Sequence, residues 1–237
     1  KNGITSINLY SIINQENINK LYDFAAVKIK TSSRVENKSF IRNFVGGNYD
    51  SGKILNFNNK DPLLNLALHP FFLFLVKGYL KQDCQLIDIT FSETFSTKDK
   101  SRKLSQKWHR DPAVRGLIKI FIYFSDVTKN CGPFEYIPKT HNNMNLNPIS
   151  GPITTKKFGG SFYPDQDKIN NKISEKNLQV ESMIGSKGKI IICDTTGLHR
   201  GGFCKDGSRL MLTLVYYPKG DPWKSRIRVS KENLNLS

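Results

Sequence analysis

The chain has 237 residues, a formal net charge of +16 and 38% hydrophobic residues. This length allows one domain with a sizeable core, and no apolar run of about eighteen residues or more predicts a transmembrane helix. The first residues lack the basic start and the apolar stretch of a secretory signal. We therefore expect a globular protein without a membrane span.

The net charge has two interpretations. A basic surface attracts anionic partners such as nucleic acid, a membrane surface, or a phosphorylated or CoA-linked substrate. The chain is also rich in Asn, Ile and Lys together, which a biased coding sequence produces without selection for binding. The basic residues are scattered, and the densest group, 98–107, has the composition of a solvated loop, so the sequence favours compositional bias.

The cysteines indicate neither a zinc site nor a disulfide framework, because none of them lies in a C-x-x-C pair. Cysteine is among the most often buried residue types, and thiols stay reduced in the cytoplasm. We therefore expect a cytoplasmic protein with reduced thiols at all four positions, which are Cys84, Cys131, Cys193 and Cys204.

The first part of the chain is predicted to be helical, with irregular connections. Residues 1–15 are mixed and are expected to include a short strand. The apolar spacing over 15–30 suits an amphipathic helix. Residues 31–60 are rich in Ser, Asn and Gly, which indicates a loop with short extended pieces.

A second helix is expected to begin at Asp61 and Pro62, which have the residue types of an N-cap and of the first helical position. Pro70 is expected to split this helix, and its second half continues over 71–80. His69 lies at the break without an acidic or imidazole neighbour at ligand spacing. It is therefore predicted to be a packed or boundary residue and not a metal ligand.

From residue 85 onward the hydrophobic pattern changes to period two, which predicts strands separated by Gly, Pro and Asn turns. The expected strands are 85–95, 116–124, 132–137, 156–163, 180–184, 189–193 and 209–217. A short helix is expected near 174–178, and the residues from 222 onward have the composition of a polar tail. The pattern predicts a mainly β sandwich or barrel preceded by helices. We expect one domain over 1–237, with a helical part over about 1–83, a β core over about 84–218 and a tail over about 219–237.

The candidate functional residues begin with the stretch K-W-H-R-D-P at 107–112. In an extended chain, residues i and i+2 point to the same face, so His109 and Asp111 project side by side just before an apolar strand. A second histidine, His199, also follows an apolar strand. Two imidazoles and one carboxylate are the ligand set of non-heme Fe(II) oxygenases, although zinc accepts the same set.

Arg209 opens an otherwise apolar strand, ten residues after His199. A buried guanidinium is costly unless it meets an anion, and its planar fork pairs well with a carboxylate. Two partners remain open. One is an acidic residue of the protein, and the other is a dicarboxylate that chelates the metal at one end and meets Arg209 at the other.

In these motifs the chain resembles the phytanoyl-CoA dioxygenase family of Fe(II)/2-oxoglutarate oxygenases, over about residues 85–218. An H-x-D motif alone is weak evidence for a family, but the order and spacing of all these motifs together are specific evidence. The stretches that carry the resemblance are W-H-R-D at 108–111, L-I-K-I-F-I-Y-F at 117–124, N-C-G-P-F-E-Y-I-P-K-T-H at 130–141, G-K-I-I-I-C-D-T-T-G-L-H-R-G-G at 188–202 and S-R-L-M-L-T-L-V-Y-Y at 208–217.

The resemblance implies a double-stranded β-helix, or jelly roll, with the N-terminal helices packed on one sheet. It also implies a catalytic Fe(II) bound by His109, Asp111 and His199. Arg209 would bind the distal carboxylate of the co-substrate 2-oxoglutarate. Phe121, on the strand after the H-x-D motif, would line the same co-substrate.

Three further positions are interpreted through the resemblance. His141 matches a turn histidine of the family and is expected to be structural. Gly201 stands where relatives often carry a polar residue that helps to bind 2-oxoglutarate, so this contact is missing or supplied from elsewhere. Halogenating relatives replace the carboxylate of the H-x-D motif with a small residue, so Asp111 favours hydroxylation, or another oxidation such as desaturation.

The predicted protein is a dioxygenase that uses O2 to hydroxylate a small polar or anionic metabolite, free or carrier-linked, and releases succinate and CO2. Candidate substrate contacts are Trp108, Arg110 and Arg115, which surround the metal motif. Arg110 faces away from His109 if this segment is extended. The long polar segment 142–178 is a candidate lid, because long loops of this kind are often functional.

Two other functions stay open. A metal-binding jelly roll of the cupin type would use the triad without 2-oxoglutarate, and Arg209 would then have no such ligand. A basic nucleic-acid-binding module would use the net charge. The chain shows neither an aromatic-and-basic stacking pattern nor a known nucleic-acid-binding motif, which makes this second alternative the weaker one.

Overall fold

The computed structural model describes most of the chain, and all structural statements below concern the residues that it describes. These residues are 2–31, 34–37, 40–45, 55–96, 101–102, 104–112, 116–141, 154–155, 161–222 and 224–230. Within this part of the chain, no helix is long and apolar enough to span a membrane.

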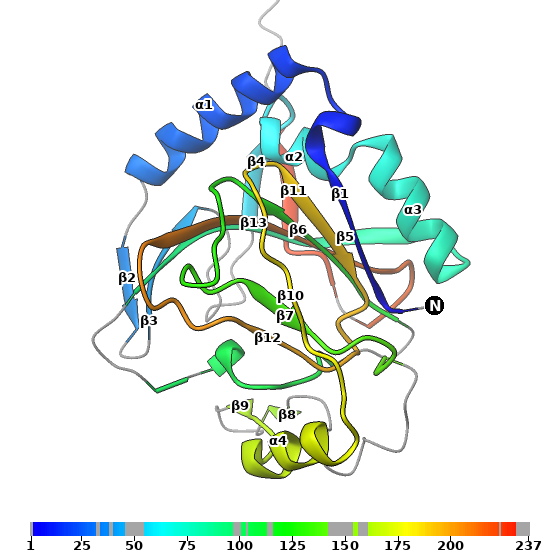
Figure 1. The fold of residues 1–237 in the computed structure, drawn as a ribbon. Coiled ribbons are helices and arrows are strands. Elements are labelled where there is room, and N and C mark those ends of the chain that lie inside the picture. The colour runs from blue at the N-terminus through cyan, green and yellow to red at the C-terminus, as the bar shows by residue number, and fades with distance from the viewer. Residues whose placement is uncertain are drawn as a thin grey trace, which may run out of the picture.

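A seven-stranded antiparallel sheet, the major sheet, forms the centre of the fold (Figure 1). Its three innermost neighbours, β6, β13 and β5, are paired over most of their lengths. In spatial order the strands are β1 (Ile4–Asn8), β11 (Lys189–Cys193), β6 (Ile118–Tyr123), β13 (Ser208–Pro218), β5 (Cys84–Phe95), β3 (Phe40–Val45) and β2 (Arg34–Asn37).

A smaller antiparallel sheet, the minor sheet, packs against one face of the major sheet. Its strands in spatial order are β10 (Glu181–Ser182), β7 (Phe134–Tyr136) and β12 (His199–Gly201). A bridge between His109 and His199 adds the H-x-D segment to its free edge. Two facing antiparallel sheets form the jelly roll that the sequence predicts, so the expected fold class is confirmed.

Three helices cover the other face of the major sheet, as predicted (Figure 1). They are α1 (Gln15–Thr31), α2 (Pro62–Ala67) and α3 (Pro70–Leu80). The side chain of Asp61 accepts the backbone N–H groups at 63 and 64 and so begins α2. The ring of His69 accepts the backbone N–H of Phe71 and begins α3, which confirms the predicted break at Pro70 and the boundary role of His69.

Alternation along β6 sends its residues into two different cores. Ile118, Ile120 and Ile122 face the helices and are buried in the largest apolar cluster. Phe121 and Tyr123 point the other way, into the cluster between the two sheets. Burial of each isoleucine side chain contributes roughly 2 kcal/mol, so this strand stabilises the packing of the helical layer on the major sheet.

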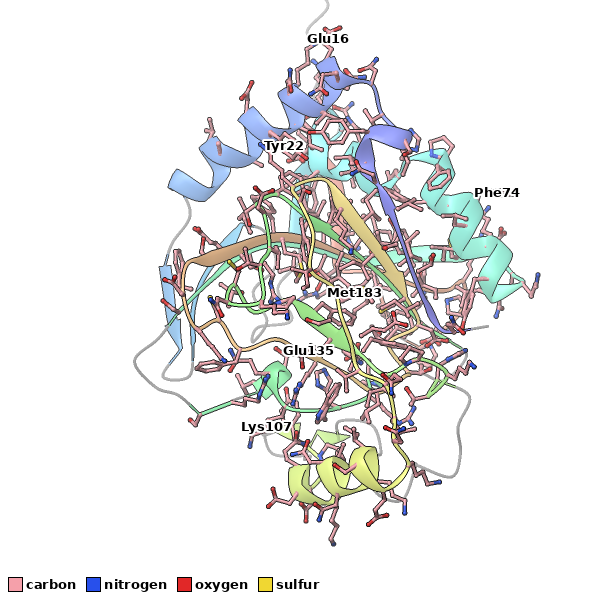
Figure 2. All side chains as sticks on the ribbon, viewed as in Figure 1. Glu16, Tyr22, Phe74, Lys107, Glu135 and Met183 are labelled. Atoms are coloured by element: carbon pink, nitrogen blue, oxygen red, sulfur yellow. The ribbon has the colours of Figure 1, made fainter. Side chains whose placement is uncertain are left out.

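Figure 2 shows how side chains fill these layers: Tyr22 extends from α1 toward the sheet, whereas Phe74 projects outward from α3. The Tyr22 ring meets Phe124 edge-on, with centroids 5.3 Å apart. Phe74 is the most exposed large apolar side chain of the described residues, at 76%. The apolar pattern of α1 therefore docks on the sheet, while one face of α3 carries exposed aromatic surface.

The remaining elements are short. They are the 3-10 turns η1 (Leu9–Ser11) and η2 (Leu104–Gln106), the helix α4 (Gln166–Glu175), the strand β14 (Ile227–Ser230), which pairs parallel with β4 (Leu55–Asn58), and the hairpin of β8 (Thr154–Thr155) with β9 (Ser161–Phe162).

Two expectations need correction. The helix expected near 174–178 begins earlier, because the side chain of Asp165 accepts two backbone N–H groups and caps α4 at its start. The stretch expected to be a tail is partly structured, since 227–230 forms β14. An ion pair between Arg226 and Asp88 of β5 and the backbone pairing with β4 hold this segment.

Candidate metal centre

Backbone pairing places the two site histidines opposite each other. His109 and His199 exchange both backbone hydrogen bonds, each with an N···O distance of 3.0 Å. Directly opposed residues of an antiparallel pair project to the same face. The two imidazole rings therefore lie next to each other, with centroids 4.2 Å apart.

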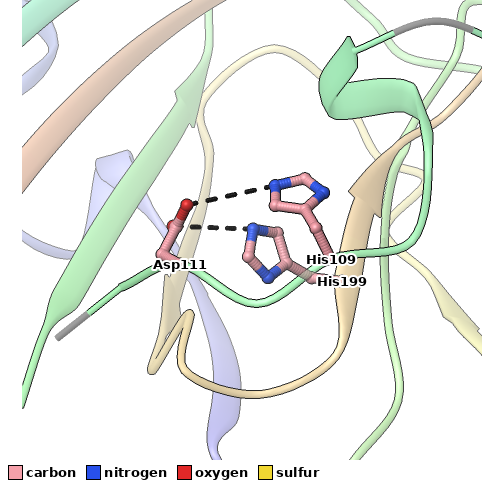
Figure 3. A group of neighbouring side chains, drawn as sticks. All are labelled: His109, Asp111 and His199. Carbon is pink, nitrogen blue, oxygen red and sulfur yellow. Dashed lines mark ion pairs between the residues drawn. The ribbon is translucent and has the colours of Figure 1, made fainter. Parts of the chain in front are cut away.

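Asp111 continues the same pairing two residues further along. Its backbone N–H donates to the carbonyl of Thr195, at 2.9 Å, so its side chain projects to the face that carries His109. Its Oδ1 lies 4.0 Å from His109 Nε2, and its Oδ2 lies 3.6 Å from His199 Nε2 (Figure 3). The potential ligand atoms of these three residues all lie within 4.8 Å of one another.

The outer nitrogen of each ring is held by a backbone carbonyl. His109 Nδ1 lies 2.7 Å from the carbonyl oxygen of Lys107, and His199 Nδ1 lies 2.9 Å from that of Gly197. A carbonyl oxygen only accepts, so Nδ1 carries the proton in both rings and Nε2 presents its lone pair to the cluster. This arrangement is typical of histidine metal ligands.

Burial fixes the protonation states of the triad. Burial lowers the pKa of His109, and burial together with the neighbouring His109 lowers the pKa of His199 to about 3. Burial alone would raise the pKa of Asp111, but Lys119 and the two histidines outweigh it and hold this pKa well below its usual range. At neutral pH the cluster therefore offers two neutral imidazoles and one carboxylate, which are the ligand forms that a divalent metal requires.

Lys119 is part of this site, although the sequence did not single it out. It projects from β6 into the space between the sheets, and its Nζ lies 2.6 Å from Asp111 Oδ2. Its side chain is 15% exposed and that of Asp111 is 11% exposed. A lysine within an apolar run was the available signal, because a buried ammonium requires an anionic partner.

Arg209 lies on the other side of the triad. A Cβ atom at Gly201, two residues after His199, would lie 3.9 Å from Arg209 Nη2. The guanidinium is 2% exposed and donates to the carbonyl of Gly132, while its Nε has no hydrogen-bond partner. Burial lowers its pKa.

No acidic side chain in the described ranges pairs with Arg209. The sequence left open an internal salt bridge or an anionic ligand, and the described residues supply no acid for the first. A buried guanidinium with an unused donor is costly unless an anion meets it. The surroundings of Arg209 thus have the chemistry of an anion-binding position.

An aromatic series connects β6 to the triad. The Phe121 ring lies 4.6 Å from that of Phe134, and the Phe134 ring lies 5.6 Å from that of His199, centroid to centroid. Phe121 is therefore in the inner wall next to the site, where the resemblance places it. Its contact with a co-substrate stays a prediction.

Trp108 and Arg110 have contacts within the protein, and their contact with a substrate stays a prediction. Trp108 is 1% exposed and packs with Ile169, Leu198 and other residues of one apolar cluster. Arg110 Nη1 donates to the carbonyls of Thr140 and Thr196, each at 2.6 Å. Both side chains point away from the triad because alternation sends them to the opposite face of the H-x-D segment. The third candidate, Arg115, lies outside the described residues.

Part of the candidate lid contacts the H-x-D segment. Residues 142–153 and 156–160 of the segment 142–178 lie outside the described residues. The amide of Gln166, at the start of α4, accepts the N–H of Trp108 at 2.6 Å and donates to its carbonyl at 3.0 Å. The Tyr163 ring meets the His109 ring edge-on at 5.4 Å.

His141 is not a member of the histidine and carboxylate cluster. Its Nδ1 is buried beside Gly3, where a Cβ atom would approach it to 2.4 Å. The neighbouring Thr140 links this turn to the site, because its Oγ1 accepts the backbone N–H of Leu198 at 2.8 Å. The turn motif therefore supports the strand that carries His199.

All four cysteines are free in the structure, and none belongs to the metal cluster. Cys193 and Cys204 are buried, whereas Cys84 and Cys131 are partly exposed. Burial raises the pKa of Cys193 well above its usual value, because it penalises the thiolate. The reduced state of the thiols stays a prediction.

At the level of sequence, neither a family model nor a curated protein matches the chain. Comparison of structures finds similar folds at low identity. SnoN, an alpha ketoglutarate dependent epimerase of nogalamycin biosynthesis, was solved with Fe3+, alpha ketoglutarate and nogalamycin RO. It is 14% identical, with 95% of this chain and 82% of SnoN covered at a TM-score of 0.66.

Two further solved structures have the same fold. EctD from S. alaskensis, with 2-oxoglutarate and 5-hydroxyectoine, is 13% identical. The match covers 97% of this chain and 84% of EctD, at a TM-score of 0.61. HygX from Streptomyces hygroscopicus, with nickel, 2-oxoglutarate and hygromycin B, is 13% identical. The match covers 92% of this chain and 84% of HygX, at a TM-score of 0.57. The chain therefore has the jelly-roll fold of these 2-oxoglutarate-binding proteins, with a buried His-Asp-His cluster between its two sheets.

Proposed function

We propose that the chain is an Fe(II)- and 2-oxoglutarate-dependent oxygenase of the phytanoyl-CoA dioxygenase type. The observation that carries this proposal is the pairing of the His109–Asp111–His199 cluster with a buried arginine that no described acid neutralises. Metal and co-substrate would be held between the two sheets of the jelly roll. The fold shared with SnoN, EctD and HygX supports the proposal.

The donor set fits iron. Two neutral imidazole nitrogens and one carboxylate on one face of a metal leave other positions open for ligands. Zinc accepts the same donors, but the additional anion-binding position argues for a co-substrate and thus for oxygenase chemistry. Bound iron would supply the activation of O2, coupled to the decarboxylation of 2-oxoglutarate to succinate and CO2.

Each residue of the site has a defined task in this proposal. The carbonyls of Lys107 and Gly197 keep the Nε2 atoms of His109 and His199 unprotonated, so both rings are ready to bind a cation. The guanidinium of Arg209 would bind the distal carboxylate of 2-oxoglutarate in two-pronged fashion. This would fix the direction in which the co-substrate enters the metal's open positions.

The inner wall would keep bulk water away from the reacting centre. Phe121 and Phe134 form the apolar side of the space next to His199. Exclusion of water strengthens electrostatic interactions inside the site and limits side reactions. The aromatic pair would therefore help to direct oxidation to the bound substrate.

The substrate is proposed to be a small polar or anionic metabolite, free or carrier-linked. Solved structures of this fold include an epimerase and a carbocyclase, so the fold alone does not fix the reaction type. Asp111 supports hydroxylation over halogenation, because the carboxylate takes the position that a halide would need.

Replacement of Arg209 by Ala tests the proposal against a metal-binding jelly roll without co-substrate. The variant should bind 2-oxoglutarate about 100-fold more weakly, because a buried charge-assisted pair is lost. Metal affinity should change by less than about threefold, because Arg209 is not a ligand and removal of a nearby cation only favours the metal. Calorimetric titrations with Mn(II), and then with 2-oxoglutarate, measure both quantities.

Arg228→Ala is the matched control, since Arg228 is exposed and bonds only to nearby carbonyls. It should leave both affinities unchanged. Equal 2-oxoglutarate affinity in wild type and Arg209→Ala would reject the assigned co-substrate position. A wild-type protein that binds Mn(II) but no 2-oxoglutarate would favour the alternative without co-substrate.

A further inference from the structure

We propose that Lys119 is a positioning residue that sets the charge of the metal centre, weakening the hold of the triad on its metal and strengthening the attraction for 2-oxoglutarate. This inference rests on the proposed metal centre and deepens it. The observation behind it is the ion pair of 2.6 Å between Lys119 Nζ and Asp111 Oδ2, the only carboxylate of the triad.

The fold holds Lys119 in this position. Its strand, β6, lies between β11 and β13, and its residues alternate between the two cores. Lys119 pairs with Cys193 on one side and with Val215 on the other, so its stem leaves the centre of the sheet toward the minor sheet. The ammonium is then held close to Asp111 by the backbone of a central strand.

Lys119 and Arg209 lie on opposite sides of the triad. The edge that carries the site runs from Thr195, which accepts the N–H of Asp111, through His199 to Gly201 beside Arg209. Lys119 contacts Asp111 at the first end and Arg209 lies at the second. Lys119 therefore does not occupy the anion-binding position of Arg209. It would affect an anion bound at Arg209 only through the net charge of the metal centre.

The charges of the described groups give the direction of each effect. Asp111 contributes −1, Lys119 and Arg209 each contribute +1, and imidazoles bind a metal in their neutral form. Lys119 cancels the single negative charge of the triad, so a divalent ion bound there keeps its full attraction for a dianion. The same cation repels the metal, and like charges at a few ångströms interact strongly in a protein interior.

Removal of the Lys119 charge should therefore move two affinities in opposite directions. Lys119→Gln keeps a hydrogen-bond donor for Asp111 but loses the charge. We expect Mn(II) to bind about tenfold more tightly, and 2-oxoglutarate to bind the Mn(II)-loaded protein about tenfold more weakly. A purely structural lysine would move both affinities downward.

Calorimetric titration of the full chain with Mn(II), followed by 2-oxoglutarate, measures both affinities in each variant. Lys119→Arg keeps the charge and should stay within about threefold of wild type in both affinities. Lys172→Met removes a lysine–carboxylate ion pair of similar length on the surface of α4, with Glu175 at 2.8 Å, and should change neither affinity.

Tighter metal binding together with weaker 2-oxoglutarate binding in Lys119→Gln supports the inference. A fall or no change in metal affinity overturns it, and so does an unchanged affinity for 2-oxoglutarate. If Lys119→Gln fails to fold, a second measurement compares Lys119→Arg with wild type at low and at high salt. Because both proteins carry the same charge, salt should change their metal affinities by the same factor, and different factors would overturn a role set by charge alone. A wild-type protein that binds no divalent metal rejects the proposed metal centre itself, which separates the two failures.

Discussion

At the scale of single residues, the chemical state of the metal centre follows from the groups that each side chain contacts. A carbonyl holds the Nδ1 proton of His109 and another holds that of His199, so both inner nitrogens are free of protons. Burial keeps both rings neutral, with the neighbouring His109 adding to this effect at His199, while Lys119 and the two histidines keep Asp111 ionised. If the triad binds a metal as proposed, these contacts prepare its ligands in advance and so reduce the reorganisation that binding requires.

The same contacts predict a loss of stability in acid when a chelator is present. Below about pH 6.5 the unfolded chain protonates its histidines, whereas the folded chain keeps His109 and His199 neutral because both have lowered pKa values. The unfolded state then binds more protons. His199, whose pKa falls to about 3, should remove up to about 1.4 kcal/mol of unfolding free energy per pH unit between about pH 6 and 5, and His109 should add a loss in the same direction.

Urea unfolding at several pH values measures this slope. The double variant His109→Asn/His199→Asn should show a clearly smaller decrease over the same range, because its two buried positions no longer titrate. Asp111, whose pKa lies below its usual range, adds a further loss only in stronger acid. An unfolding free energy of the wild type that is constant from pH 7 to 5 would contradict the neutral, buried state of the imidazoles.

At the scale of elements, the H-x-D segment is held from two sides. Strand β12 pairs with it through His199, and the Gln166 amide at the start of α4 bonds both backbone groups of Trp108. The Trp108 side chain is buried against Ile169 of α4. The helix thus acts as part of the scaffold for the proposed metal ligands.

Replacement of Gln166 by Ala should therefore weaken both the fold and the metal centre. Two partly buried backbone groups of Trp108 lose their partner, at a total cost of about 1–3 kcal/mol. Mn(II) affinity should fall several-fold, because Trp108 directly precedes His109. Thermal unfolding and Mn(II) titration check the two effects.

Gln15→Ala provides the comparison for this prediction. Gln15 also uses its amide in a hydrogen bond, at 2.8 Å to Asn19, but on an exposed face of α1. Its loss should change stability by no more than about 0.5 kcal/mol and leave metal binding unaltered. If both glutamine variants behave alike, α4 does not support the metal motif.

Several elements could be predicted from the sequence because their signals are local. The period-two pattern predicts β5, β6, β11 and β13, and the residue types of Asp61, Pro62 and Pro70 predict the two short helices. Strand β14 is not predictable in this way, because its partner β4 lies far away in the sequence. The start of α4 depends on the capping side chain of Asp165, which a polar stretch does not reveal.

The candidate site was predictable in part, for the same physical reason. His109 and Asp111 are linked by simple alternation, whereas their proximity to His199 followed only from the motif order of a known family. Lys119 was missed, because a lysine in an apolar strand gives no indication of the carboxylate that it will meet. Trp108 and Arg110 flank His109 in the sequence, but alternation sends their side chains to the opposite face, where they contact other parts of the protein.

At the scale of the whole molecule, the helical layer and the candidate metal centre lie on opposite faces of the major sheet. Helices α1–α3 cover the outer face of the major sheet, and the minor sheet lies on its inner side (Figure 1). The proposed metal ligands come from the minor sheet and its edge, whereas Lys119 and Arg209 come from the major sheet. Two members of the basic excess, Lys119 and Arg209, are part of this inner space. The net charge of +16 therefore has an internal component in addition to its surface component.

The most direct test of the oxygenase proposal is the release of succinate by the intact protein. The protein is loaded with Fe(II) and 2-oxoglutarate without oxygen, O2 is admitted, and succinate is quantified alone and with a panel of small polar and anionic metabolites. We predict succinate formation that requires Fe(II), increases with at least one metabolite and is lost in Asp111→Ala. No succinate above the Asp111→Ala background under any of these conditions would contradict the proposed function.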